Sequence, residues 1–126
     1  MSLPSHNPFS DCVLCEGTTS IAASPVAMIF AAPCDGYVVL GSAVSNGTTT
    51  GTITVAVKIN GSATDIFGGT LTIPAGTGPV NNGFVALPLT GASAVPVAKG
   101  DAIVATPSGG TGASIAGAVS LVIRRT

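Results

Sequence analysis

The sequence predicts an all-β protein, an antiparallel jelly-roll β-sandwich of about eight strands with an extended N-terminal arm. Two observations lead to this prediction. Short apolar runs recur about every ten residues, separated by Gly, Pro, Asn-Gly or Asp-Gly, as in sandwiches and barrels. No segment shows the 3.6-residue apolar period of an amphipathic helix. The 17 Gly and 9 Pro residues therefore indicate turns.

The composition is that of one domain whose core is built from aliphatic side chains. The chain has 126 residues, of which 46% are hydrophobic but only 4% are aromatic. Charged residues make up 7%, against about 25% in ordinary soluble domains. So few charges predict a surface of Thr, Ser and Asn, or one buried against other subunits. A net charge of −1 offers no electrostatic footprint for nucleic acid.

The division into domains follows from where the β pattern begins. Residues 1–24 contain Pro4, Pro8 and scattered apolar residues, which predicts an irregular arm. Residues 25–126 are predicted to form the sandwich. The N-terminus lacks the basic start and apolar stretch of a signal peptide, and no apolar run is long enough for a membrane helix.

Eight segments fit the strand pattern, each an apolar or β-branched run that turn residues close. In chain order they are Val26–Ala32, Tyr37–Val44, Thr52–Ile59, Asp65–Ile73, Phe84–Leu89, Ala94–Val97, Ala102–Thr106 and Ile115–Arg124. Loops are expected at 74–79 and 107–112, where Gly and Pro cluster.

Individual strands carry more specific signals. The third and the last alternate with period two, which predicts one face in the core and one in water. Asn60-Gly61 follows the third strand as a type I′ turn signal. Gly68-Gly69 suggests a bulge or bend in the fourth strand, and Asn82-Gly83 a turn before the fifth. The apolar runs also predict core positions for Phe30, Phe67 and Phe84.

The ionisable residues do not form a recognisable catalytic set. The carboxylates are Asp11, Glu16, Asp35, Asp65 and Asp101. Asp35 and Asp101 are candidates for the carboxylate pair of a glycosidase. Both are next to a Gly in a predicted turn, where a short carboxylate side chain accepts hydrogen bonds from the backbone, so a turn role is favoured. The one histidine, His6, lies in the arm, which disfavours a Ser-His-Asp triad. We expect no enzyme and no catalytic residues.

Cys12-Val13-Leu14-Cys15 is the sharpest local motif, because Cys-x-x-Cys can bind metal or exchange disulfides. With His6 and Cys34 it supplies the ligand types of a zinc site, although the spacing matches no compact zinc module. A disulfide between Cys12 and Cys15, or one that involves Cys34, is a second alternative. Unmodified thiols packed as small apolar residues are favoured over both.

No cofactor is expected. The Gly-rich segments at 76–78 and 109–112 do not open helices, so they offer no helix N-terminus for a phosphate group. A carbohydrate-binding platform of exposed aromatics would have to come from Tyr37 and four Phe residues, without any Trp.

Three phrases, taken in order, resemble the small jelly-roll decoration (cement) proteins of tailed-bacteriophage capsids. They are Ala32–Val39, Val55–Gly61 and Val95–Ile103, followed by a Gly-rich loop and a last β-run. The resemblance covers about residues 25–125 and does not include the cysteine-bearing arm. It implies a structural virion protein on the capsid exterior, made in the host cytoplasm. Its partners would be the major capsid protein lattice and copies of itself, as a homotrimer more readily than a dimer.

Two other binding roles remain open. The chain is also similar to jelly-roll heads of other phage structural proteins, which implies a receptor- or glycan-binding head of a phage fibre. A secreted C1q/TNF-like or adhesin module is the third alternative, and it would need a secretion route that this chain does not show.

Overall fold

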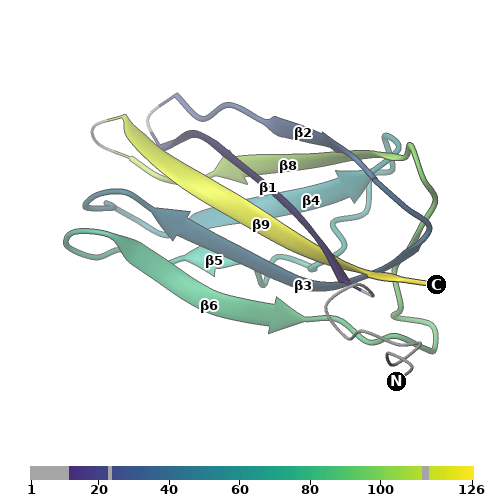
Figure 1. The fold of residues 1–126 in the computed structure, drawn as a ribbon. Coiled ribbons are helices and arrows are strands. Elements are labelled where there is room, and N and C mark those ends of the chain that lie inside the picture. The colour runs from purple at the N-terminus through teal and green to yellow at the C-terminus, as the bar shows by residue number, and fades with distance from the viewer. Residues whose placement is uncertain (1–11, 23, 112–113) are drawn as a thin grey trace, which may run out of the picture.

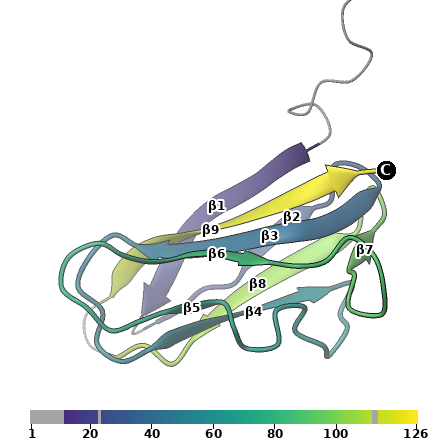
Figure 2. The ribbon, with the colours of Figure 1, turned by 90° about the horizontal axis from the view of Figure 1, so that it is seen from below.

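Two antiparallel sheets pack face to face in the computed structural model, which describes residues 12–22, 24–111 and 114–126 (Figures 1 and 2). No helix occurs among those residues. The larger sheet has the order β1 (Cys12–Ala22), β9 (Ile115–Arg125), β3 (Gly36–Ser45) and β6 (Val80–Ala86), with β7 (Pro96–Val97) paired to the start of β3. The smaller sheet has the order β2 (Met28–Ala31), β8 (Ala102–Ser108), β4 (Ile53–Ile59) and β5 (Thr72–Ile73). The predicted all-β class and sandwich are confirmed.

Alternate residues of the strands fill the space between the sheets. Val55 and Val57 of β4 and Leu121 and Ile123 of β9 are fully buried, as the period-two pattern predicted. Burial of each such side chain contributes about 1.5–3 kcal/mol, and most of the buried side chains are aliphatic. Asn60 and Gly61 both have positive φ (52° and 74°), which confirms the turn expected after β4.

The N-terminal arm was predicted too long. Residues 12–22 are not irregular: they form β1, which pairs with β9 from Cys12 opposite Arg124 to Ala22 opposite Ile115. The strand has a weak local signal because Gly17 stands at a core-facing position, where a Cβ would lie 3.2 Å from the Met28 sulfur and 3.3 Å from the Phe30 ring. Residues 1–11 of the predicted arm lie outside the described residues.

The predicted strand at 65–73 is also wrong over most of its length, because only Thr72 and Ile73 form β5. The Asp65 carboxylate occupies the place of a strand carbonyl and accepts a hydrogen bond from Val57 N at 3.0 Å. It also accepts from Phe67 N and Gly69 N, and this local network winds the chain into a turn. Positive φ at Gly68 and Gly69 completes that turn.

The fifth strand begins earlier than predicted and places Phe84 outside the core. Asn82-Gly83 does not precede the strand but lies within β6, where a bulge makes three residues of β6 span two of β3. Val85 then faces the core, so its neighbour Phe84 points outward with 69% of its surface exposed. Phe67 is buried and Phe30 packs against the core, as expected. Pro107, predicted in a loop, is a buried residue of β8.

Candidate functional site

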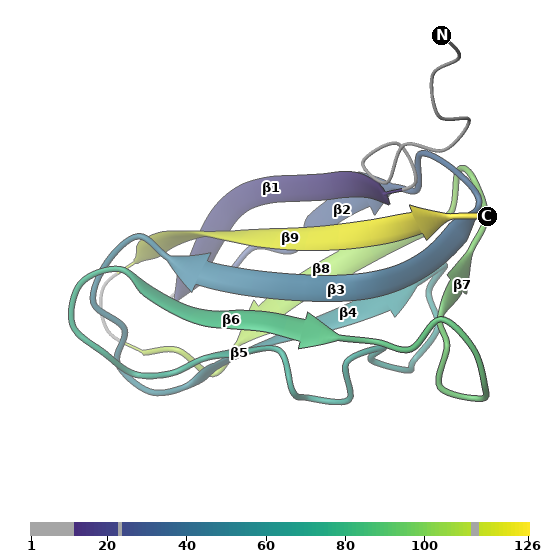
Figure 3. The same ribbon diagram turned by 60° about the horizontal axis from the view of Figure 1, so that its bottom comes forward.

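The outer face of the larger sheet carries an uninterrupted apolar row across its four long strands. The register sets Leu14 of β1 opposite Val122 of β9, Val122 opposite Leu40 of β3, and Leu40 opposite Ala86 of β6. Figure 3 shows these strands side by side in that order. Leu14 is 56% exposed, and Phe84 of β6 stands outward beside Ser42 in the next row. We call this surface the outer face.

Only two charged side chains project from the outer face of the described chain. Glu16 and Arg124 alternate outward with Leu14 and Val122 along β1 and β9. They lie four residues apart in the register, because Arg124 is opposite Cys12 and Glu16 is opposite Ser120. The remaining outward positions are apolar or uncharged, so most of this face can be desolvated without burying a charge.

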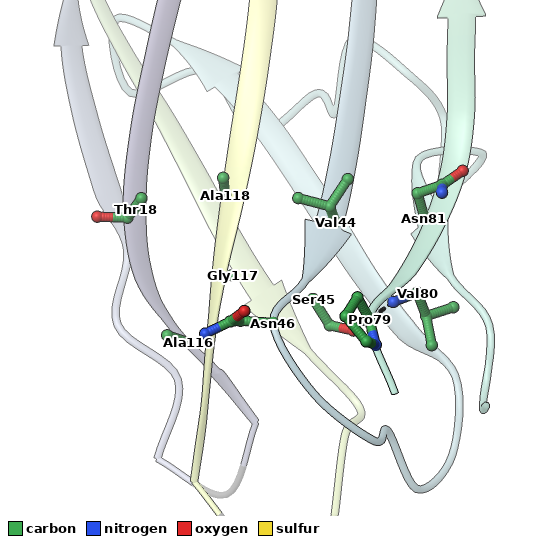
Figure 4. Close-up of a pocket in the computed structure, with 10 residues that line it drawn as sticks. All are labelled: Thr18, Val44, Ser45, Asn46, Pro79, Val80, Asn81, Ala116, Gly117 and Ala118. Carbon is green, nitrogen blue, oxygen red and sulfur yellow. Dashed lines mark hydrogen bonds between the residues drawn. The ribbon is translucent and has the colours of Figure 1, made fainter. Parts of the chain in front are cut away.

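A groove of about 430 Å³ lies on the outer face, at the end of β9 that is distant from Arg124 (Figure 4). Thr18 of β1 and Val44 of β3 flank the outward side chains Ala116 and Ala118 of β9. The remaining lining residues are Ser45, Asn46, Pro79, Val80, Asn81 and Gly117. The side chains drawn in Figure 4 are short. The lining combines apolar surface with a few amide and hydroxyl groups.

Small residues in β9 and one serine create this groove. A Cβ at Gly117 would lie 2.5 Å from the backbone oxygen of Val44, so only glycine permits this close approach of β9 and β3. Ser45 Oγ accepts a hydrogen bond from Val80 N at 3.0 Å and donates one to Gly47 O at 2.9 Å. This buried hydroxyl fixes the Pro79–Asn81 side of the groove against the end of β3.

The sequence analysis did not identify the outer face. Leu14 fell in the predicted arm and Phe84 in the predicted core, and only the outward residues of β9 followed from the period-two alternation predicted for the last strand. A strict period-two count from Val85 and Leu87 would have placed Phe84 outward. Gly83 has a positive φ of 72° within the bulge at residues 81–84, so the Asn82-Gly83 pair marked this bulge but was interpreted as a turn.

Asp35 and Asp101 meet at one corner of the sandwich, where both accept backbone hydrogen bonds. Asp101 Oδ2 accepts from Ala98 N at 2.9 Å, and Asp35 Oδ1 accepts from Lys99 N at 2.8 Å. The bond from Ala98, with a smaller contribution from Asn60, lowers the pKa of Asp101. A general acid near neutral pH needs a raised pKa, so this carboxylate suits turn capping, which confirms the role predicted for both residues.

The cysteines do not converge on one site. Cys12 and Cys15 are three residues apart on β1, so their side chains point to opposite faces: Cys12 is exposed and Cys15 is buried. Burial raises the pKa of Cys15, and the nearby Cys34 thiol raises it further. Within the described chain no three Cys, His, Asp or Glu side chains are grouped as metal ligands, and all three cysteines are free. His6 lies outside the described residues.

We expect the three thiols to react at clearly different rates with Ellman's reagent in the folded protein. Cys12 should react first, because it is exposed, and Cys15 last, because burial and a raised pKa both lower its accessible thiolate. Cys12→Ser should remove the fast phase and leave the slow phases unchanged. In urea without reductant all three thiols should react. A fast phase that persists in Cys12→Ser would contradict the assignment.

Comparisons of this chain with family models, with curated proteins and with solved structures give no match. Among the described residues there is no helix with the length and apolar character needed to cross a membrane.

Proposed function

We propose that this chain is a structural virion protein, a jelly-roll decoration (cement) protein that binds the exterior of a major capsid protein lattice and stabilises the shell. The main support is the distribution of charge. Of the charged residues in the described chain, only Glu16, Lys58, Arg124 and Arg125 lie on strands. The sandwich therefore presents broad, nearly uncharged surfaces, which suit close packing against other subunits with little desolvation cost.

The strand order supports the jelly-roll part of this proposal. The chain alternates between the sheets from β1 to β4, and β8 and β9 insert between strands that come early in the sequence. Numbered without the short β7, the orders are 1-8-3-6 and 2-7-4-5, the arrangement that two interlocked Greek keys generate. Resistance to internal pressure calls for a rigid module, and many copies on a symmetric shell add modest contacts into strong binding.

The test mixes the purified protein with capsids assembled without it and measures cosedimentation and the melting temperature of the shell. We expect saturable binding at a fixed number of chains per capsomer and a higher shell melting temperature. We propose the N-terminal arm as one contact with the shell. Removal of residues 1–11 keeps every described strand, so this truncated chain should fold but bind the shell more weakly. A longer truncation would delete β1 and is not informative. No cosedimentation of the full chain would refute the proposal.

The groove favours one other candidate, a glycan-binding head of a phage fibre. Its volume of about 430 Å³ falls within the usual range of ligand pockets, and Thr18, Asn46 and Asn81 offer hydrogen-bonding groups to sugar hydroxyls. A glycan array distinguishes the two candidates. Saturable sugar binding without affinity for capsids would establish the fibre head in place of the decoration protein.

A further inference from the structure

We propose that two copies of this chain pair through the outer face of the larger sheet, with Phe84 of each copy seated in the groove of the other. This inference does not rest on the capsid proposal, because it concerns only the surface of the chain itself. It starts from the exposure of large apolar side chains. Leu14, Val44 and Phe84 are 56%, 38% and 69% exposed on one continuous face. Contiguous apolar surfaces of this kind mark interaction sites.

The size of the outer face limits the area that a pair of such chains can bury. Four strands about 4.8 Å apart and eleven residues of about 3.3 Å each give an area of roughly 700 Å². A stable interface of standard size buries about 800 Å² from each partner. With Phe84 seated in the partner's groove the two faces cross nearly at right angles and overlap over about half of this area, roughly 370 Å². The pair is therefore expected to be weaker than one of standard size, with the Phe84 anchor supplying much of its binding.

The face is complementary to itself in shape. Phe84 is its most exposed aromatic projection, and the groove over Ala116 and Ala118 is its concavity. A twofold axis requires both features on the same surface, because each copy must supply the projection and the hollow. The groove exceeds one phenyl ring in volume, and a buried aromatic anchor in a pocket is the usual centre of binding energy.

The two charges of the outer face are complementary under the same twofold. On a flat grid of about 4.8 Å between strands and 3.3 Å per residue, placing Phe84 over the partner's groove offsets Glu16 from the partner's Arg124 by roughly 9 Å in the plane of the sheets. With packed sheets about 10 Å apart, the two Cα atoms are then roughly 13 Å from each other. The two extended side chains can span that distance. The strands of the two copies then cross at nearly a right angle, one of the two usual arrangements of packed sheets.

A second copy explains these features better than an unrelated partner, because one surface carries projection and hollow as well as both signs of charge. The resemblance to decoration proteins implies a trimer more readily than a dimer. A closed trimer needs two different contact patches on each chain, whereas the outer face combines both halves of a contact in one patch. The measured mass decides between the two.

The experiment is sedimentation equilibrium of the full chain over a range of concentrations. The wild type is expected at twice the 12.1 kDa of one chain. Phe84→Lys should weaken pairing by about 30-fold or more, the effect of losing a central anchor. Ile29→Lys is the matched control, because Ile29 is 75% exposed on the other sheet and its replacement should leave pairing unchanged. Circular dichroism confirms that each variant is folded.

Charge reversal adds a test that a merely structural role would not pass. Glu16→Arg and Arg124→Glu should each weaken pairing, and the double variant should restore it, because both contacts across the twofold are then re-formed with opposite sign. A wild-type mass of one chain or of three chains would overturn the proposal. So would a Phe84→Lys variant that pairs as tightly as the wild type.

Discussion

Replacing Phe67 with alanine is expected to lower the free energy of unfolding by about 3–5 kcal/mol, the usual cost of truncating a buried aromatic residue. Phe67 is only 4% exposed, and its ring lies over Gly41 of β3 between the two sheets. Domains of this kind are stable by about 5–15 kcal/mol, so the variant should lose about a fifth or more of that stability. Urea unfolding followed by circular dichroism measures the loss.

Gly41 provides the matched variant for this prediction. A Cβ at Gly41 would overlap the Phe67 ring, so Gly41→Ala alone should cost about 1–3 kcal/mol through overpacking. In the Phe67→Ala background the added methyl group enters the space that the ring has left. The double variant should therefore be more stable than the sum of the single effects predicts, by about 0.5–3 kcal/mol. Strictly additive losses would show that the two residues do not pack together.

Asp65→Ala should be the second most damaging change, with an expected loss of about 2–4 kcal/mol in the free energy of unfolding. Asp65 Oδ1 accepts from Val57 N at 3.0 Å and from Phe67 N at 3.1 Å, while Oδ2 accepts from Gly69 N at 2.9 Å. Alanine removes both acceptor oxygens and with them all three hydrogen bonds, and it leaves the backbone amide of the buried Val57 in β4 without its partner. The melting temperature and the urea midpoint should both fall.

Asp65→Asn tests whether the acceptor geometry is the cause. Asparagine keeps one side-chain oxygen that can accept from Val57 N and Phe67 N, but it presents an amide group toward Gly69 N. The stability of Asp65→Asn should therefore lie between that of the wild type and that of Asp65→Ala. Equal losses for the two variants would show that the negative charge, and not the hydrogen bonds, stabilises this turn.

The local patterns predicted several parts of the fold well. The alternation in β4 and β9, the Asn60-Gly61 turn and the capping roles of Asp35 and Asp101 depend on residues that are close in sequence. β1 escaped prediction because its weak apolar pattern becomes a strand only through pairing with β9, from the far end of the chain. The strand at 65–73 was overestimated because one carboxylate satisfies backbone groups that a ladder would otherwise satisfy.

The candidate site, too, could be predicted from the sequence only in part. The scarcity of charge and aromatic residues was visible in the sequence, and it already pointed to a protein that acts through its surfaces. The place of those surfaces was not visible, because the row from Leu14 to Ala86 joins four strands that are distant in the chain. A bulge in β6 precedes the outward-facing Phe84, and the short side chains of Ala116 and Ala118 leave the groove open.

By itself, the sequence determined the all-β class, the aliphatic core and the corners of the sandwich, because side-chain alternation and turn chemistry act over a few residues. The tertiary structure alone decided which strands are neighbours and hence which side chains share the outer face. Strand neighbours depend on hydrogen bonding and packing between distant segments, and a one-residue change of register reverses every side chain that follows. For this protein, that reversal separates a buried Phe84 from an exposed one.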